Sequence, residues 1–129
     1  LARRCDYVVA TLHFALEFTG SATPQEGLAN LARSVPTAVV TLGADGLIWQ
    51  RGGDQGELSA FPVAVVDTTV AGDTFHGAFA AGVAAGMDWI DLLRYASAAG
   101  ALCCTGHGAR LAIPTPQEVD ALLTANPYV

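Results

Sequence analysis

The stretch VVDTTVAGDTFHG, residues 65–77, joins an apolar run to a helix-compatible run through a turn of small residues. We expect a buried strand to run into Asp67, and a helix to open at about Gly72 and to end at Gly86. The first amides of a helix have no partners inside the helix, and they lie at the positive end of its dipole. The stretch therefore predicts a strand–turn–helix unit whose helix start binds an anion.

An acidic side chain, Asp73, follows Gly72 at once in this predicted helix start. Gly72 lets a phosphate approach the backbone closely. A carboxylate beside an anion site is electrostatically unfavourable if the site only binds phosphate. It makes chemical sense if the carboxylate accepts the proton of a hydroxyl that attacks that phosphate. A helix-start carboxylate that only stabilises the dipole is the simpler alternative for Asp73.

Strand and helix signals that alternate before this unit predict an α/β fold. Short apolar runs at 7–10 and 38–42 are typical of strands buried on both faces. A capping box at Thr23–Glu26 predicts a helix between them, to about Arg33, so the two strands should be parallel. We expect an antiparallel edge to follow, made of a turn at 43–46, a strand at 47–50, a polar hairpin tip at 51–56 and an extended stretch at 58–66.

Two more helices are predicted after Gly86. The first is capped by Asp88 and runs to about Cys104, and the second starts at a capping box at 115–118 after a loop at 105–110. Inside the helix at 72–86, Gly77 and Gly82 each lower helix propensity by about 1 kcal/mol. Close packing or the close approach of a ligand must compensate for them.

Composition limits the classes of function. The chain has 129 residues, of which 52% are hydrophobic and 14% charged, as expected for one globular α/β domain. Its net charge of −6 argues against nucleic acid as a partner. No lysine is present, which excludes the Walker A loop and the strand lysine of protein kinases. A phosphate site in this chain must use backbone amides, arginine or metal ions.

The three cysteines, Cys5, Cys103 and Cys104, suggest neither a disulfide framework nor a zinc site. We interpret them as small buried residues of a cytoplasmic protein. No apolar run approaches the roughly 20 residues of a membrane span, so no membrane partner is expected. The chain starts at Leu1 and soon enters a strand-like run, which we interpret as a fragment of a longer protein.

The pattern at residues 67–77 resembles that of the ribokinase-like carbohydrate kinases, the pfkB family. These proteins carry Asp-Thr-x-Gly-Ala-Gly-Asp-x-Phe-x-Gly, and this chain reads Asp-Thr-Thr-Val-Ala-Gly-Asp-Thr-Phe-His-Gly. The departure is Val70 at the first glycine. Thr41–Gly46 is similar to the family's nucleotide segment, and Gly100–Pro114 is similar to its adenine-side helix end and loop. The resemblance covers essentially the whole chain, as the second half of a protein about twice as long.

The resemblance implies a Rossmann-like, three-layer αβα sandwich. Residues 1–129 would be its C-terminal, ATP-binding and catalytic portion, without the N-terminal sugar-binding half and lid. ATP would phosphorylate a sugar hydroxyl, with Asp73 as the general base and the backbone amides of Ala71, Gly72 and Asp73 as the anion hole. Contacts to the nucleotide would come from Thr41, Gly43, Gly46, Val70, His107 and Gly108.

Cations are also implied by the resemblance. Asp67 and Thr69 would hold a monovalent cation such as K⁺, and Mg²⁺ would bridge the nucleotide phosphates. After its first strand the family usually has Asn-x-x-Glu, which is linked to magnesium and phosphate handling. Thr11 and Phe14 stand at these two positions and replace no carboxylate. We expect a rearranged magnesium network or a weaker activity.

Several alternatives stay open. One alternative is a kinase whose acceptor is a nucleoside or another small alcohol. Another is a non-catalytic nucleotide-binding module. Gly43 and Gly46 suit any hairpin turn, Asp67 suits a turn, and His76 suits a packing role. A homodimer is also left open. The isolated chain should be inactive, because the half that orients the acceptor lies outside it.

Overall fold

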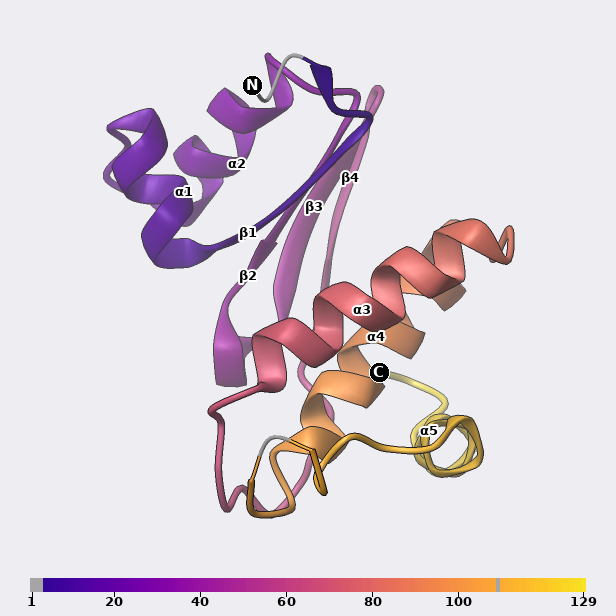
Figure 1. Cartoon of the computed structure of the whole chain (residues 1–129). Helices are drawn as coiled ribbons and strands as arrows, with labels where there is room; N and C mark the ends of the chain where they lie inside the picture. The colour runs from indigo at the N-terminus through magenta and orange to yellow at the C-terminus, as the bar shows by residue number, and fades with distance from the viewer. Residues whose placement is uncertain (1–3, 109) are drawn as a thin grey trace. The chain divides into compact units, whose positions relative to one another are not determined.

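The computed structural model describes residues 4–108 and 110–129 and divides the chain into two compact units, Leu1–Ser59 and Ala60–Val129. The first unit contains a four-stranded sheet and two α-helices, and the second contains three α-helices (Figure 1). The predicted α/β class is therefore confirmed. In the part of the chain that the structure describes, none of the helices combines the length and the apolarity that crossing a membrane requires.

The sheet of the first unit is mixed, and its strand order is β1-β2-β3-β4. Its strands are β1 (Tyr7–Thr11), β2 (Thr37–Thr41), β3 (Leu47–Arg51) and β4 (Asp54–Leu58). β1 and β2 are parallel, with Val9 opposite Val39, whereas β3 and β4 continue the sheet in antiparallel pairs. The parallel start and the antiparallel edge are both as predicted.

Two helices, α1 (Leu12–Thr19) and α2 (Pro24–Ala32), connect β1 to β2 and lie on the same face of the sheet (Figure 1). Thr23 caps α2 by accepting the amide of Glu26 at 3.2 Å. The sequence interpretation missed α1, although its ends are marked. Thr11 caps its start, and Gly20 ends it with a φ of 66°. The core between helices and sheet is formed by Ala10, Ala15, Leu28, Leu31, Val35, Ala38, Val40 and Ile48.

The antiparallel edge contains two tight turns. Between β2 and β3, Leu42 N–H donates to the carbonyl of Gly46 at 2.7 Å. Between β3 and β4, only Gly52 and Gly53 form the turn, because Arg51 already pairs with Asp54. The predicted hairpin tip at 51–56 was therefore too long. The polar residues that suggested a loop belong to an edge strand, where charged side chains protect the unpaired backbone.

The second unit contains α3 (Ala71–Ala84), α4 (Trp89–Cys103) and α5 (Pro116–Ala125), close to the predicted bounds. Gly86 follows α3 with a φ of 71°, which a residue with a side chain rarely adopts. At Thr115 the full capping box with Glu118 is present. Asp88 stands at the start of α4 as predicted, but its side chain makes no capping hydrogen bond.

Packing in the second unit joins α3 to α4 and α4 to α5. Phe75 and Phe79 are buried and stacked, with ring centroids 6.2 Å apart. A second cluster is formed by Phe61, Ala98, Ala99 and Val119. Arg94 of α4 donates to the carbonyls of Asn126 at 2.9 Å and Val129 at 2.6 Å, so it ties the end of the chain to this cluster.

Two local predictions are wrong. Residues 59–66 form no strand, and Val65 is 62% exposed rather than buried. A strand needs a neighbouring strand, whereas the amides of Val66 and Asp67 donate to the carbonyl of Cys104. Cys103 and Cys104 are buried as expected, but Cys5 is exposed because it precedes β1.

Candidate functional site

The first turn of α3 forms the centre of the candidate site. Val70 precedes the helix with φ −116° and ψ 13°, and its side chain makes no capping hydrogen bond. The amide of Ala71 donates to the carbonyl of Thr68 at 3.2 Å. Among the described residues, the amides of Gly72 and Asp73 have no hydrogen-bond partner. These two N–H groups are the donors that a helix start offers to an anion.

Val70 fits this turn without strain. The pattern that residues 67–77 resemble has a glycine at this position, which suggests a positive φ. The backbone at Val70 has a negative φ instead. Within residues 4–108 and 110–129, positive φ angles occur at glycines alone. The Val70 side chain lines the same pocket as Asp73, so it takes up room beside the predicted anion site.

Two contacts hold the start of α3 against the end of α4. A Cβ added at Gly100 would lie 3.2 Å from the carbonyl oxygen of Ala71 and 3.5 Å from the Cβ of Phe75. Gly100 therefore allows the two helices to approach closely. The Thr74 hydroxyl donates to the Sγ of buried Cys103 at 3.2 Å. Together these contacts fix where the free amides point.

The segment before α3 is held by the same end of α4. The carbonyl of Cys104 accepts the amides of Val66 at 2.7 Å and Asp67 at 3.1 Å. The Thr69 hydroxyl and amide both donate to the Asp67 carboxylate, and they hold the pKa of Asp67 below its ordinary value of 3.8. The backbone N–H of Gly108 acts on this pKa in the same direction. Asp67 is therefore ionised at neutral pH and lies beside the loop that carries Gly108.

Asp73 itself is exposed on the first turn of α3 and lines a pocket of about 510 Å³. Residues from α3, α4, α5 and the loop before α5 form the pocket wall. They are Val70, Asp73, Thr74, Gly77, Ala78, Tyr95, Ala99, Arg110, Ile113, Pro114, Pro116 and Val119. A Cβ added at Gly72 or Gly77 would meet no atom within 4 Å. The backbone beside Asp73 is thus open to a ligand.

Burial raises the pKa of the Cys104 thiol, and the neighbouring Cys103 and Asp67 act in the same direction. The Cys104 thiol donates to the carbonyl of Gly100 at 3.3 Å. Thiols that stay protonated are poor nucleophiles. Cys104 is therefore a packing residue at the end of α4, and Cys103 is buried beside it, as the sequence predicted.

His76 is exposed on α3 and makes a local contact. Its Nδ1 lies 2.7 Å from the carbonyl oxygen of Gly72. Since a carbonyl only accepts, Nδ1 carries the hydrogen. The ring also lies edge-on to Phe75, at 6.2 Å between centroids. These contacts agree with the packing role weighed for His76.

The predicted site residues fall in both units. Asp67, Thr69, Val70, Ala71, Gly72, Asp73, His107 and Gly108 belong to the second unit, and Thr41, Gly43 and Gly46 belong to the first. The structure brings Val70 and Asp73 into one pocket, and it places the Gly108 amide where it lowers the pKa of Asp67. Gly43 and Gly46 have φ angles of 62° and 87°, which the turn between β2 and β3 by itself explains. The Thr41 hydroxyl donates to the carbonyl of Ala10 at 3.4 Å.

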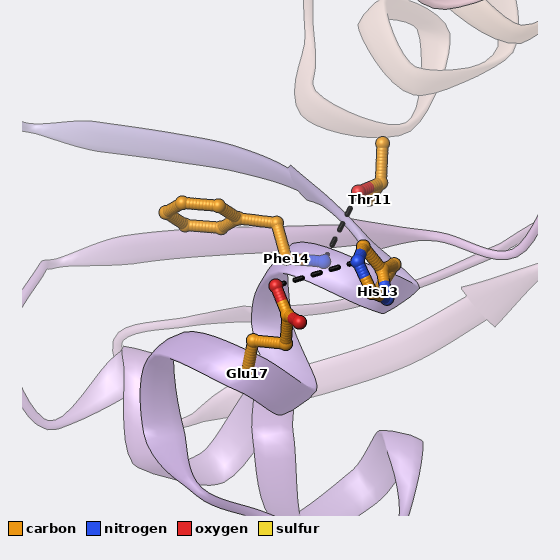
Figure 2. A network of polar contacts seen from close by, with 4 residues as sticks. All are labelled: Thr11, His13, Phe14 and Glu17. Atoms are coloured by element: carbon orange, nitrogen blue, oxygen red, sulfur yellow. Dashed lines mark hydrogen bonds and ion pairs between the residues drawn. The ribbon is translucent and has the colours of Figure 1, made fainter.

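The positions aligned with Asn-x-x-Glu lie at the start of α1, and Figure 2 shows their contacts. The Thr11 hydroxyl accepts the amide of Phe14 at 3.2 Å, and His13 pairs with Glu17 at 3.3 Å. The Phe14 ring offers no metal ligand, and it stacks on Phe18 at 5.3 Å between centroids. Among the described residues, no group of three His, Cys, Asp or Glu side chains is arranged to hold a metal ion. Thr11 and Phe14 therefore offer no carboxylate to a magnesium ion.

Sequence reasoning did not single out Arg110 and Tyr95, two polar residues of the pocket beside Asp73. The absence of lysine did point to arginine as a phosphate-binding side chain, but no local pattern marked Arg110. Tyr95 lies in the middle of α4, where an aromatic residue is usually a core residue.

Comparison with known proteins assigns this chain to a family. Residues 1–116 match the profile described as pfkB family carbohydrate kinase. A ribokinase from Schizosaccharomyces pombe is 36% identical over 126 residues, which cover 90% of this chain and 40% of that protein. The structure of Arabidopsis thaliana ribokinase complexed with ribose and ATP matches with a TM-score of 0.89 and 32% identity, over 95% of this chain and 42% of that one.

A fructokinase double mutant from Vibrio cholerae, solved in a form with fructose, ADP and potassium ion bound, matches with a TM-score of 0.84 and 32% identity. The match covers 92% of this chain and 41% of that chain. The chain thus spans less than half the length of the relatives it matches. These likenesses confirm the ribokinase-like fold predicted from the sequence. The chain belongs to the pfkB family of carbohydrate kinases.

Proposed function

We propose that this chain is the C-terminal, ATP-binding and catalytic part of a kinase that phosphorylates a sugar hydroxyl. One observation carries the proposal: Asp73 lies in a pocket at a helix start whose amides at Gly72 and Asp73 have no partner among the described residues. A base and an anion site meet there. A site that only bound a nucleotide would not need the base.

In the proposed reaction, Asp73 accepts the proton of the acceptor hydroxyl. The hydroxyl oxygen bonds to the γ-phosphorus of ATP, and the bond from that phosphorus to the bridging oxygen breaks, so ADP leaves. The amides of Gly72 and Asp73 stabilise the negative charge that develops on the transferred group. The Ala71 amide joins them only if it leaves the carbonyl of Thr68.

Nucleotide contacts are assigned to two segments. Thr41 ends β2 and Gly43 and Gly46 lie in the turn after it, whereas His107 and Gly108 lie in the loop after α4. The order of these segments along the chain agrees with that of the family. The A. thaliana ribokinase is complexed with ATP, which supports a nucleotide site in a protein of this fold.

The proposed site uses two kinds of cation, a magnesium ion and a monovalent ion. Thr11 and Phe14 provide magnesium with no carboxylate, so Mg²⁺ would reach the site together with the nucleotide phosphates. Asp67 suits a cation, because its carboxylate is ionised and lies next to the loop of Gly108. With Thr69, it would hold a monovalent cation that organises this loop. The potassium form of the V. cholerae fructokinase supports such a site.

A second candidate is a non-catalytic nucleotide-binding module. The observation that favours it is the start of α1, where an N-cap threonine and an exposed phenylalanine replace the family's polar pair. The two candidates differ in one property, which is turnover.

The test is an ADP-release assay with the intact kinase that carries this chain, over a panel of sugars and nucleosides. We expect ATP-dependent turnover with at least one sugar, and none from the isolated 129-residue chain. Turnover with nucleosides alone would show that the acceptor is a nucleoside rather than a sugar. Nucleotide binding without turnover, in well-folded intact protein, would favour the binding module instead.

A further inference from the structure

The pocket beside Asp73 combines one acidic and one basic side chain, Asp73 and Arg110. Most of the remaining wall is apolar, from Ala78 and Ala99 to Ile113 and the prolines of the last loop. Among the described residues, no ion pair joins Arg110 to Asp73. The guanidinium therefore keeps its donors available for a third group.

We propose that Arg110 is a phosphate-contacting residue of this site and binds the phosphate chain of the nucleotide. This inference rests on the proposed kinase function. The chain has no lysine, and Arg110 is the basic side chain that the structure places in the pocket with Asp73. Guanidinium groups bind phosphate oxygens through two parallel hydrogen bonds, which fix orientation as well as charge.

The loop that carries Arg110 is held on both sides. A Cβ added at Gly106 would lie 3.3 Å from the Cβ of Ala112, so the two arms of the loop approach closely. The amide of Ala112 donates to the carbonyl of Gly108 at 3.3 Å. Gly108 also donates its own amide toward Asp67. The loop is thus joined to the segment that leads into α3, and Arg110 follows Gly108 by two residues.

Charge balance gives Arg110 a defined role. Asp73 repels an incoming phosphate, and the net charge of the chain is −6. The two free amides of the helix start carry only partial charge. A full positive charge in the same pocket offsets the carboxylate and lets base and phosphate occupy neighbouring positions.

The experiment is a calorimetric titration of the intact kinase that carries this chain with ATP, tripolyphosphate, adenosine and gluconate. Three variants are compared with the unaltered protein: Arg110→Met, Arg110→Lys and Arg33→Met. Arg33 is an arginine at the end of α2, outside the pocket, so its replacement is a control with the same loss of charge. A thermal melt of each variant checks the fold.

For Arg110→Met we expect the dissociation constants of ATP and tripolyphosphate to rise about tenfold or more, as for the loss of a charge-assisted hydrogen bond. Arg110→Lys should recover part of this loss, and Arg33→Met should show none. Adenosine binding should not change, since the contact is to phosphate.

The outcomes separate this inference from the proposed function. If the unaltered protein binds ATP and Arg110→Met binds it equally well, Arg110 has no phosphate role and the kinase assignment stands. A loss confined to gluconate would assign Arg110 to an acidic acceptor and overturn the phosphate contact. If the unaltered protein binds neither ATP nor tripolyphosphate, both the proposed nucleotide site and the phosphate contact of Arg110 are excluded.

Discussion

The two ends of α3 use glycine in opposite ways. At the first turns, a Cβ added at Gly72 or Gly77 would meet no atom within 4 Å. Towards the other end, a Cβ added at Gly82 would clash with Cδ1 of Leu92 and lie 3.1 Å from Sδ of Met87. One end of the helix is open, and the other is closed by α4 and by the turn before it.

Each glycine inside the helix costs about 1 kcal/mol relative to alanine. At Gly82 this cost is offset by the close approach of a buried leucine, so the glycine is explained by packing. At Gly77 no packing contact explains it, and the position lines the pocket with Asp73. The difference agrees with the proposal that the open end serves a ligand, whereas the closed end serves the fold.

The largest effect is expected at Asp73 of the open end. In the intact kinase, Asp73→Asn should lower kcat about 10²- to 10⁴-fold, because asparagine cannot accept the hydroxyl proton. The melting temperature should stay near that of the wild type, and the ATP dissociation constant should stay near it or fall slightly, because a negative charge beside the phosphate is gone. Asp88→Asn is the matched control, at the start of α4, where the aspartate makes no capping hydrogen bond. A folded Asp73→Asn enzyme with wild-type kcat would show that Asp73 only stabilises the helix.

At the closed end the expected loss is in stability. Gly82→Val should lower the free energy of unfolding by about 1–3 kcal/mol, since buried Leu92 must move to make room. Chemical denaturation measures this loss. Adding Leu92→Val, which removes the clashing Cδ1, should recover part of it in a double-mutant cycle. If Gly82→Val unfolded at the wild-type denaturant concentration, the closed end would be looser than the structure indicates.

Gly77→Ala should have the opposite sign and a smaller size. The new methyl group meets no atom, and alanine favours the helix, so we expect a gain of about 0.5–1 kcal/mol in unfolding free energy. The same denaturation experiment measures it. A loss of stability at Gly77 would mean that the two ends of α3 do not differ in the way described.

The smallest effect concerns Asp67, in the segment before the open end. Hydrogen bonds from Thr69 lower the pKa of Asp67 in the folded state. They therefore stabilise the fold at pH values above 3.8, the ordinary pKa of this carboxyl group. This contribution is lost as the pH falls through the lowered pKa. Asp67→Asn should therefore melt slightly below the wild type at pH 7, and the difference should shrink as the pH falls below 3.8. A difference independent of pH would exclude the ionised carboxylate as its source.

Local signals in the sequence predicted much of this structure. The capping boxes at Thr23 and Thr115 mark helix starts that the structure contains, and Gly86 marks a helix end. These signals work because capping and positive φ depend on a few neighbouring residues. The missed helix α1 carried similar signals in Thr11 and Gly20. The stretch at 59–66 was misread because strand pairing depends on a partner that an apolar run does not specify.

By itself, the sequence determined the helix starts, the tight turns and the eleven-residue pattern around Asp73, because each depends on residues close together in the chain. Tertiary structure decided which side chains share a pocket with Asp73. Tyr95, Arg110 and Val119 reach that pocket from a second helix, a loop and a third helix. Tertiary structure also decided that Gly77 has open space beside it whereas Gly82 is packed against Leu92, although both lie in the same helix. The physical reason is that capping acts within one turn of backbone, whereas a pocket wall depends on which faces of distant helices meet.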